Sequence, residues 1–368
     1  MIKRCIFHIP NYIDLNRKSA SNIRPFKMIK AFENIGYQVD CIMGYGKERK
    51  KSIKEIKKNI RNGVKYDFLY SESSTMPTLL TEKNHLPTYP FLDFNFFKFC
   101  KKHNIKIGLF YRDIHWKFEL YNVSVPFPKR NISKIFYRYD LLEYRQLVDV
   151  LYLASEQVKQ YLPIKNIECN NYKIKSLPPG CEIKEIKVED ENKTTLKLFY
   201  VGGISEELYN FEKVLVAVNQ IRDVELTICC REKEWEKIKV KYERYINENI
   251  KIVHITGEEL EKFYNDVDVC IMVFKENPYM SMAMPMKLFE YISNRKPIIA
   301  TTKTAAGDFV QENNIGWTIE YNEKSILDLL NNIQKDRNQI KEKVENFDKV
   351  IELNTWEERA KKVAKDLS

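Results

Sequence analysis

The chain has 368 residues, a hydrophobic content of 44% and a formal net charge of +10. This length exceeds one ordinary core and predicts about two domains, while short apolar runs exclude a membrane-spanning helix. The opening residues MIKRCIFHIP do not have the pattern of a signal peptide. The eight cysteines show no zinc-ligand spacing, so we expect reduced, buried thiols and a cytoplasmic protein.

The N-terminal part begins with a strand over 4–9, a loop, a helix over 26–34 and a strand over 37–43. This order is typical of the start of a doubly wound sheet. The loop before the helix contains polar side chains that suit an acceptor phosphate or sugar: Ser19, Ser21, Asn22 and Arg24. The alternative is that Ser21 or Asn22 caps the helix.

Two segments, 47–62 and 127–147, are rich in Lys and Arg. The first also has isoleucines at helical spacing, and the second interleaves its cations with Phe and Tyr. Both segments suit an anionic membrane surface, or they are solvated helix faces. Because no nucleic-acid-binding module accompanies them, we predict a membrane partner and no nucleic acid.

A strand over 67–74 is predicted to lead into a helix, and the next strand covers 105–111. Arg112, Asp113 and His115 follow that second strand. Open α/β sheets bind ligands at this end of their strands, so the three residues are candidate functional groups. The alternative for His115 is simple packing beside Trp116.

After a charged linker over 182–193, strands and helices alternate again. The stretch 196–205 is predicted as a strand that runs into Gly202 and Gly203, before a helix over about 210–221, and at these glycines the backbone can approach a ligand closely. Arg231 follows a strand over 224–230 and suits a diphosphate, or it forms a surface ion pair with Glu232 or Glu234. The last helix, over 354–367, is amphipathic.

Residues 267–301 read as a strand, a loop, a short helix after Pro285 and a second strand. Lys287 and Glu290 are three residues apart and share one side of the helix near its N-terminus. A cation and a carboxylate there suit a ligand with a diphosphate and a ribose diol. An ordinary solvated Lys–Glu pair is the alternative.

The string PMKLFEYISNRKPIIAT resembles the donor-site signature of GT-B glycosyltransferases related to family 4. The resemblance implies that Glu290 binds the ribose hydroxyls of a nucleotide-sugar. The family usually has a second glutamate eight positions upstream, where this chain has Met282. The predicted donor site also includes Gly202, Gly203, Arg231, His254, Thr256, Gly257, Met286, Lys287 and Leu288, with His254, Thr256 and Gly257 on the base side.

In the N-terminal domain the resemblance implies a residue beside the reacting sugar. Asp113 would take the acceptor proton if the reaction inverts, and His115 would hydrogen-bond the sugar if it retains, the course implied by the family. The predicted acceptor residues are Ser19, Ser21, Asn22, Arg24 and Arg112. No metal or cofactor is predicted, and a UDP-sugar is the favoured substrate.

The predicted fold is GT-B, with two Rossmann-like doubly wound domains facing a central cleft. Residues 1–181 would form the acceptor domain, joined by a crossing helix over 354–368, and 194–353 the donor domain. The predicted activity transfers a sugar to a glycan or lipid-linked glycan, in bacterial surface-polysaccharide synthesis on the cytoplasmic face of the membrane. The alternatives are a sugar-nucleotide epimerase or hydrolase, and a non-catalytic nucleotide-sugar-binding protein.

Overall fold

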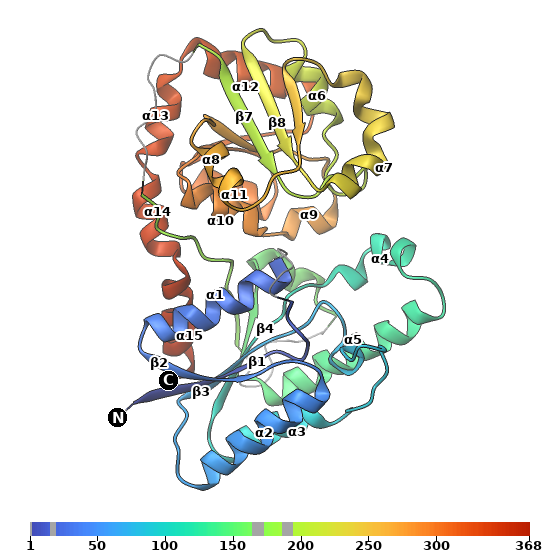
Figure 1. The fold of residues 1–368 in the computed structure, drawn as a ribbon, viewed down its shortest axis with the longest axis vertical. Coiled ribbons are helices and arrows are strands. Elements are labelled where there is room, and N and C mark those ends of the chain that lie inside the picture. The colour runs from blue at the N-terminus through green and yellow to red at the C-terminus, as the bar shows by residue number, and fades with distance from the viewer. Residues whose placement is uncertain (1, 15–19, 164–172, 186–193) are drawn as a thin grey trace. The chain divides into compact units, whose positions relative to one another are not determined.

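The structure, a computed structural model, describes residues 2–14, 20–163, 173–185 and 194–368. The chain divides into two compact units: Met1–Gly180 with Trp356–Ser368, and Cys181–Thr355. Each unit is built around one sheet (Figure 1). Across the described ranges, no helix combines the length and apolar content needed to cross a membrane.

The sheet of the first unit has six strands, all parallel to their neighbours, in the order β2-β1-β3-β4-β5-β6. The strands are β1 Lys3–His8, β2 Tyr37–Ile42, β3 Phe68–Glu72, β4 Lys106–Phe110, β5 Val150–Leu153 and β6 Lys173–Ser176. Every residue of β3 and β5 is buried, as expected for central strands covered on both faces.

The helices of the first unit fall into two packed groups. α1 packs against α15, and α3 packs against both α2 and α5. The helices are α1 Ala20–Asn34, α2 Gly46–Arg61, α3 Leu92–Lys102, α4 Glu119–Ser124, α5 Lys129–Leu147 and α15 Trp356–Leu367, with 3-10 turns η1 Thr78–Leu80, η2 His115–Lys117 and η3 Glu156–Tyr161.

Helix α15 belongs to the first unit although it ends the chain. It buries Trp356, Ala360, Val363 and Leu367 at helical spacing. A Cβ on Gly108 of β4 would lie 2.8 Å from a methyl carbon of Leu367, so only glycine lets the helix approach this closely. The four buried side chains of α15 therefore complete the core of the first unit.

The second unit has a parallel sheet in the order β12-β11-β10-β7-β8-β9. The strands are β7 Leu196–Val201, β8 Val224–Cys229, β9 Ile250–Val253, β10 Val269–Met272, β11 Ile298–Thr301 and β12 Gly316–Ile319. The helices are α6 Glu212–Val218, α7 Glu232–Tyr242, α8 Glu258–Tyr264, α9 Pro278–Met282, α10 Met286–Ser293, α11 Ala305–Glu312, α12 Glu323–Lys335, α13 Asn338–Val344 and α14 Phe347–Asn354, with the 3-10 turn η4 Glu243–Tyr245.

Several predicted elements differ from the observed ones. Helix α1 begins at Ala20 rather than at 26 and contains Pro25, so Ser21, Asn22 and Arg24 lie within the helix and neither Ser21 nor Asn22 is its cap. The helix predicted after β3 is only the 3-10 turn η1, because Pro77 and the prolines that follow interrupt helical hydrogen bonding. Strand β6 and helix α9 were not predicted, and residues 186–193 of the predicted linker lie outside the described residues.

Candidate active site

The predicted donor residues of the second unit gather at one edge of its sheet. Strand β7 ends at Val201, just before the two glycines, and β8 and β9 end shortly before Arg231 and His254. Because all neighbouring strands are parallel, these strand ends meet at the same edge, where open α/β sheets bind ligands.

Gly202 provides the closest approach in this region. It has φ +145, a conformation that residues with a side chain rarely adopt. A Cβ at this position would lie 2.5 Å from Nζ of Lys287. The glycine therefore lets the lysine ammonium reach the backbone of the loop after β7, as the predicted donor site requires.

Aromatic side chains surround Lys287. Its Nζ donates a hydrogen bond to the Tyr200 hydroxyl at 2.5 Å and lies 4.1 Å from the centroid of that ring. The centroids of Tyr209 and Phe274 lie 4.4 and 5.3 Å from the same Nζ. The three ring faces attract the cation, so they hold the amine in place without neutralising its charge.

Burial lowers the pKa of Lys287 to about 7, and the nearby Arg231 guanidinium acts in the same direction. The carboxylates of Glu290 and Glu234 oppose this shift. The charged form of this lysine is therefore less favoured than in a solvent-exposed lysine, and a bound anion would favour it again.

Arg231 lies near Lys287 but is paired with a carboxylate. Its exposed guanidinium forms an ion pair with Glu234, three residues along the chain. The surface ion pair that the sequence offered as the alternative is thus observed. Glu234 Oε2 would lie 3.5 Å from a Cβ on Gly203, so a carboxylate that sequence reasoning did not assign to the site stands beside the glycine loop.

Glu290 is half-buried on α10, one turn after Lys287. Burial raises its pKa, whereas the Lys184 ammonium and the Tyr264 hydroxyl favour its ionised form. A carboxylate in such a setting can accept two hydroxyl hydrogen bonds from a diol.

The predicted base-side residues follow β9. His254 is exposed, and its Nδ1 lies 2.8 Å from the carbonyl oxygen of Cys230, so Nδ1 donates and a neutral ring keeps Nε2 as an acceptor. Thr256 is also exposed, and Gly257, with φ +68, is the cap of α8. These groups are accessible at the strand end.

Two positions of the predicted donor helix differ from expectation. Leu288 is fully buried, and its N–H is bonded to the carbonyl of Pro285, so neither its side chain nor its amide is available to a donor. Met286 is half-buried at the first position of α10. Met282, where the family usually has glutamate, is 3% exposed and packs into the core.

In the first unit, Asp113 and His115 lie together just beyond β4. Asp113 Oδ1 accepts a hydrogen bond from the His115 amide at 2.9 Å, and its Oδ2 lies 3.4 Å from His115 Nδ1. The imidazole also meets the rings of Tyr121 and Tyr137 edge-on. About a quarter of each side chain is exposed, at 23% for Asp113 and 27% for His115, so both remain accessible.

Arg24 and Arg112 are both engaged by one buried carboxylate. Glu72, the last residue of β3, is fully buried, and its oxygens lie 3.3 Å from Arg24 Nε and 2.6 Å from Arg112 Nη2. The Arg24 guanidinium also lies 3.6 Å from the centroid of the Phe110 ring. Arg24 is therefore part of the core rather than an acceptor contact, and Glu72 was not identified from the sequence.

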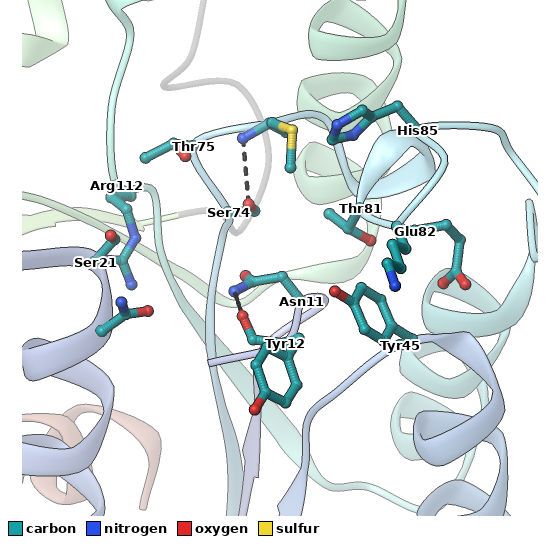
Figure 2. A pocket seen from close by; sticks show the side chains of 13 residues that line it. Asn11, Tyr12, Ser21, Tyr45, Ser74, Thr75, Thr81, Glu82, His85 and Arg112 are labelled. Carbon is teal, nitrogen blue, oxygen red and sulfur yellow. Dashed lines mark hydrogen bonds between the residues drawn. The ribbon is translucent and has the colours of Figure 1, made fainter. Parts of the chain in front are cut away.

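A cavity of about 270 Å³ opens among the strand-end loops of the first unit (Figure 2). Of the predicted acceptor residues, Ser21, Asn22 and Arg112 line it, while Ser19 lies outside the described residues. The rest of the lining was not predicted from the sequence: Asn11, Tyr12, Tyr45, Ser74, Thr75, Met76, Thr81, Glu82, Lys83 and His85. The feature of the sequence that could have pointed to these residues is their position after strands β1, β2 and β3.

Comparison with protein families gives one match. Residues 195–336, which lie in the second unit and make up less than half of the chain, match the family described as Glycosyl transferases group 1. No curated protein sequence matches the chain significantly.

Solved structures give the fold of the whole chain. It is similar to sucrose-phosphate synthase from Thermosynechococcus elongatus, with TM-score 0.64, 13% identity and coverage of 99% of this chain and 98% of that one. It is similar to Anabaena Alr3699/HepE in complex with UDP-glucose, with TM-score 0.65, 10% identity and 99% coverage of both chains. For WaaG, a glycosyltransferase involved in lipopolysaccharide biosynthesis, the TM-score is 0.59, the identity 12% and the coverage 99% of both chains.

The fold and the family match agree on a class. The two parallel α/β sheets have the fold of the similar glycosyltransferase structures, and residues 195–336 of the second unit match the Glycosyl transferases group 1 family. The fold class and the enzyme class predicted from the sequence are confirmed at this level.

Proposed function

We propose that the chain transfers a sugar from a nucleotide-sugar, with a UDP-sugar favoured, to a glycan or lipid-linked glycan. The observation that carries this proposal is the placement of Lys287 and Glu290 on α10, with the lysine ammonium against Gly202 at the strand ends. One similar structure, that of Anabaena HepE, was determined with UDP-glucose, which supports the donor class.

In this proposal the donor is held by its two chemically distinct parts. Glu290 accepts hydrogen bonds from the ribose hydroxyls, and Lys287 meets the diphosphate together with the first amides of α10. Arg231 joins them when its ion pair with Glu234 opens. These groups stabilise the departing diphosphate, so we propose that the reaction needs no metal.

The acceptor side of the reaction is assigned to the first unit. The Asp113 carboxylate is oriented by its hydrogen bond from the His115 amide, so it is placed to accept the proton of an acceptor hydroxyl in an inverting reaction. His115 donates a hydrogen bond to the transferred sugar in a retaining one. We propose retention, as in the family 4 enzymes that the α10 sequence resembles.

A transfer assay tests the proposed function. Purified protein is incubated with UDP-, GDP-, ADP- and dTDP-sugars, with and without membrane glycolipid extract, and free nucleotide and glycosylated product are measured by chromatography. We expect acceptor-dependent product in the presence of EDTA, lowered at least about tenfold by Glu290→Ala through the loss of charged hydrogen bonds. The exposed carboxylate variant Glu259→Ala is the matched control on the neighbouring helix α8.

The same assay separates the alternatives. An epimerase or hydrolase would consume donor equally well without an acceptor. A binding protein would show no turnover with any donor while still being stabilised by one of them.

We also propose that the protein adheres to the cytoplasmic face of the membrane, as expected for an enzyme of bacterial surface-polysaccharide synthesis. Support comes from the region around α5, where large apolar side chains are exposed and cations are close to them in the sequence. The exposed apolar residues are Val123, Phe127, Ile132, Ile135 and Leu142. The cations are Lys129, Arg130, Lys134 and Arg138. On the other basic helix, α2, the apolar residues Ile53 and Ile56 are buried, which leaves a charged outer face. Adhesion is therefore assigned to α5.

Vesicle sedimentation tests this adhesion. We expect binding to vesicles that contain phosphatidylglycerol, and much less to pure phosphatidylcholine. The double variant Phe127→Ser, Ile135→Asn should release the protein, whereas the control Lys50→Gln, Lys54→Gln on α2 should not. Full binding of the apolar double variant, together with loss of binding in the lysine variant, would mean that attraction is purely electrostatic and that the α5 assignment is wrong.

A further inference from the structure

The cavity of the first unit, at the carboxyl ends of β1, β2, β3 and β4, has a lining that discriminates between two kinds of acceptor group. The polar residues predicted near it suit either a phosphate or a sugar. A phosphate offers only hydrogen-bond acceptors and negative charge, so it needs donors and uncompensated cations. A sugar offers hydroxyl donors and an apolar ring face, so it suits acceptors and aromatic side chains.

The arginines of this region already donate hydrogen bonds to acceptors of the protein itself. Arg112, which lines the cavity, is bound to Glu72 through Nη2 and to the Ser73 carbonyl through Nε. Arg49, whose Nη2 lies 3.9 Å from an oxygen of the lining residue Glu82, forms two hydrogen bonds to Asp93, at 3.0 and 3.1 Å. Lys83 is the one lysine among the described lining residues, and its side chain is exposed to solvent.

Acceptor atoms, by contrast, belong to lining residues of two loops, the one after β1 and the one after η1. Asn11 Oδ1 is buried and makes no hydrogen bond within the described part of the chain, while its amide nitrogen donates to the Tyr12 carbonyl. Glu82 has one oxygen bound to the Gly46 amide at 2.6 Å, and its side chain is 15% exposed. His85 Nδ1 donates to the Leu80 carbonyl, so its neutral ring offers Nε2 as an acceptor.

An aromatic surface completes the lining. The rings of Tyr12 and Tyr45 are stacked with centroids 5.6 Å apart and planes within 11°. Figure 2 shows the Tyr12 ring below Asn11 and the Tyr45 ring to the right of Asn11, with Ser21 and Arg112 on the left and Glu82 and His85 on the right. Tyr12 is 56% exposed, which leaves ring surface open for an apolar ligand face.

We propose that this cavity binds an uncharged pyranose unit of the acceptor. The sugar ring packs on the tyrosine pair formed by Tyr12 and Tyr45, and its hydroxyls donate to Asn11 Oδ1 and to the Glu82 carboxylate. A buried acceptor atom without a partner costs free energy until a hydroxyl satisfies it, so the empty site favours a polyol ligand. This inference rests on the proposed function, because it takes the first unit as the acceptor side.

Ligand-observed NMR on the full chain tests the proposal directly. Methyl glycopyranosides of glucose, galactose, mannose and N-acetylglucosamine are compared with inorganic phosphate and glycerol phosphate. We expect saturation transfer to at least one glycoside, strongest at its ring protons, and a dissociation constant about tenfold higher in Tyr45→Ala, the size of effect expected for one lost ring contact. Tyr45→Phe keeps the ring and should bind as the wild type does, and Glu82→Gln should weaken binding severalfold.

Controls keep this result separate from that of the proposed function. Stabilisation of each variant by the UDP-sugar, read as a melting-temperature shift, reports the second unit and should equal that of the wild type. If glycosides fail to bind while donor stabilisation is intact, the pyranose proposal is overturned and the donor assignment stands. Binding of inorganic phosphate that is lost in Lys83→Ala would overturn it as well, since the site would then be an anion site.

Discussion

At the scale of single residues, Lys287 shows how an amine can be held ready for an anion. Three aromatic rings and the Tyr200 hydroxyl fix its position, and burial brings its pKa to about 7. The ring faces stabilise the protonated amine less than water does, so part of the Lys287 population is neutral near pH 7. A ligand that supplies negative charge shifts this equilibrium toward the protonated form. A diphosphate entering the site would complete that charge.

Donor affinity should therefore depend on pH through Lys287. Below about pH 7 the ammonium is present in the free protein, and above it each bound diphosphate must draw a proton from solvent. We expect the dissociation constant of the UDP-sugar to rise above pH 7, by up to about tenfold per pH unit. Calorimetric titration in two buffers of different ionisation enthalpy measures both the affinity and the proton uptake.

The matched variant for this prediction is Lys287→Arg, whose guanidinium stays charged throughout the range. Its donor affinity should be independent of pH. Parallel pH profiles for the wild type and this variant would show that another group controls the dependence.

Sequence reasoning at this scale succeeded where the partners are close along the chain. The spacing of Lys287 and Glu290 places them on one helix side, and Asp113 and His115 follow one strand. It did not find Glu72 as the partner of both Arg24 and Arg112, because that pairing joins helix α1, the end of strand β3 and the loop after β4, which are far apart in the sequence. Charged residues at strand ends signal function, but the folded structure decides which of them are already paired.

At the scale of elements, the first unit is held together by a buried charged network among β1, α2 and α3. His8 Nε2 lies 2.9 Å from an oxygen of Asp93, which also accepts two hydrogen bonds from Arg49. Burial opposes the ionisation of Asp93, but His8 and Arg49 together hold its pKa below the ordinary value. The network fixes α2, whose N-terminal residues border the cavity.

Replacing Asp93 by Asn should destabilise the first unit strongly. The change keeps the volume but leaves the buried Arg49 guanidinium without its main counter-charge, a loss of about 3–5 kcal/mol in unfolding free energy. Denaturant unfolding followed by tryptophan fluorescence measures it. The exposed pair of Lys30 and Glu33 offers the control, since Glu33→Gln should cost less than about 1 kcal/mol.

Helix α5 carries a second buried carboxyl that links it to η1. Asp140 Oδ2 accepts a hydrogen bond from the Thr78 amide at 2.7 Å, while Oδ1 is buried with no partner in the described residues. Burial raises the pKa of Asp140 to about 8, against the effect of the Thr78 hydrogen bonds. The folded protein therefore keeps this carboxyl protonated at neutral pH.

Stability should fall as pH rises through this range. Below about pH 4 the Asp140 carboxyl is protonated in both the folded and the unfolded protein, so its contribution to the free energy of unfolding is fully present. Between about pH 4 and pH 8 only the folded protein retains the proton, so the free energy of unfolding decreases progressively as the pH rises. Asp140→Asn keeps an acceptor for Thr78 and cannot ionise. We expect this variant to match the wild type near pH 4 and to be more stable at pH 9 in thermal unfolding. An unchanged difference between the two proteins across the range would contradict the raised pKa.

The elements that the sequence missed have identifiable causes. Strand β6, Lys173–Ser176, has no apolar alternation because it is an edge strand with no fully buried residue. Helix α1 extends through Pro25, which the sequence rules treat as a start or a break. Long apolar strands and strongly amphipathic helices were predicted well, because burial on a sheet face or helix side leaves a periodic pattern.

At the scale of the whole molecule, alternation of strands and helices was enough to predict two doubly wound sheets. The similarity of the full chain to GT-B structures at 10–13% identity shows that this architecture persists while most side chains change. The family match, in contrast, is confined to residues 195–336. The second unit thus retains recognisable sequence, whereas the cavity in the first unit had to be identified from the structure.

The central claim is that α10 binds a nucleotide-sugar, and calorimetric titration of the full chain with UDP-, GDP-, ADP- and dTDP-sugars tests it most directly. We predict that one nucleotide class binds with one-site stoichiometry and that Glu290→Ala and Lys287→Ala each weaken it by about tenfold or more, with folding intact. If no nucleotide-sugar binds, or if binding is unaffected by both substitutions, the donor site is not where this account places it.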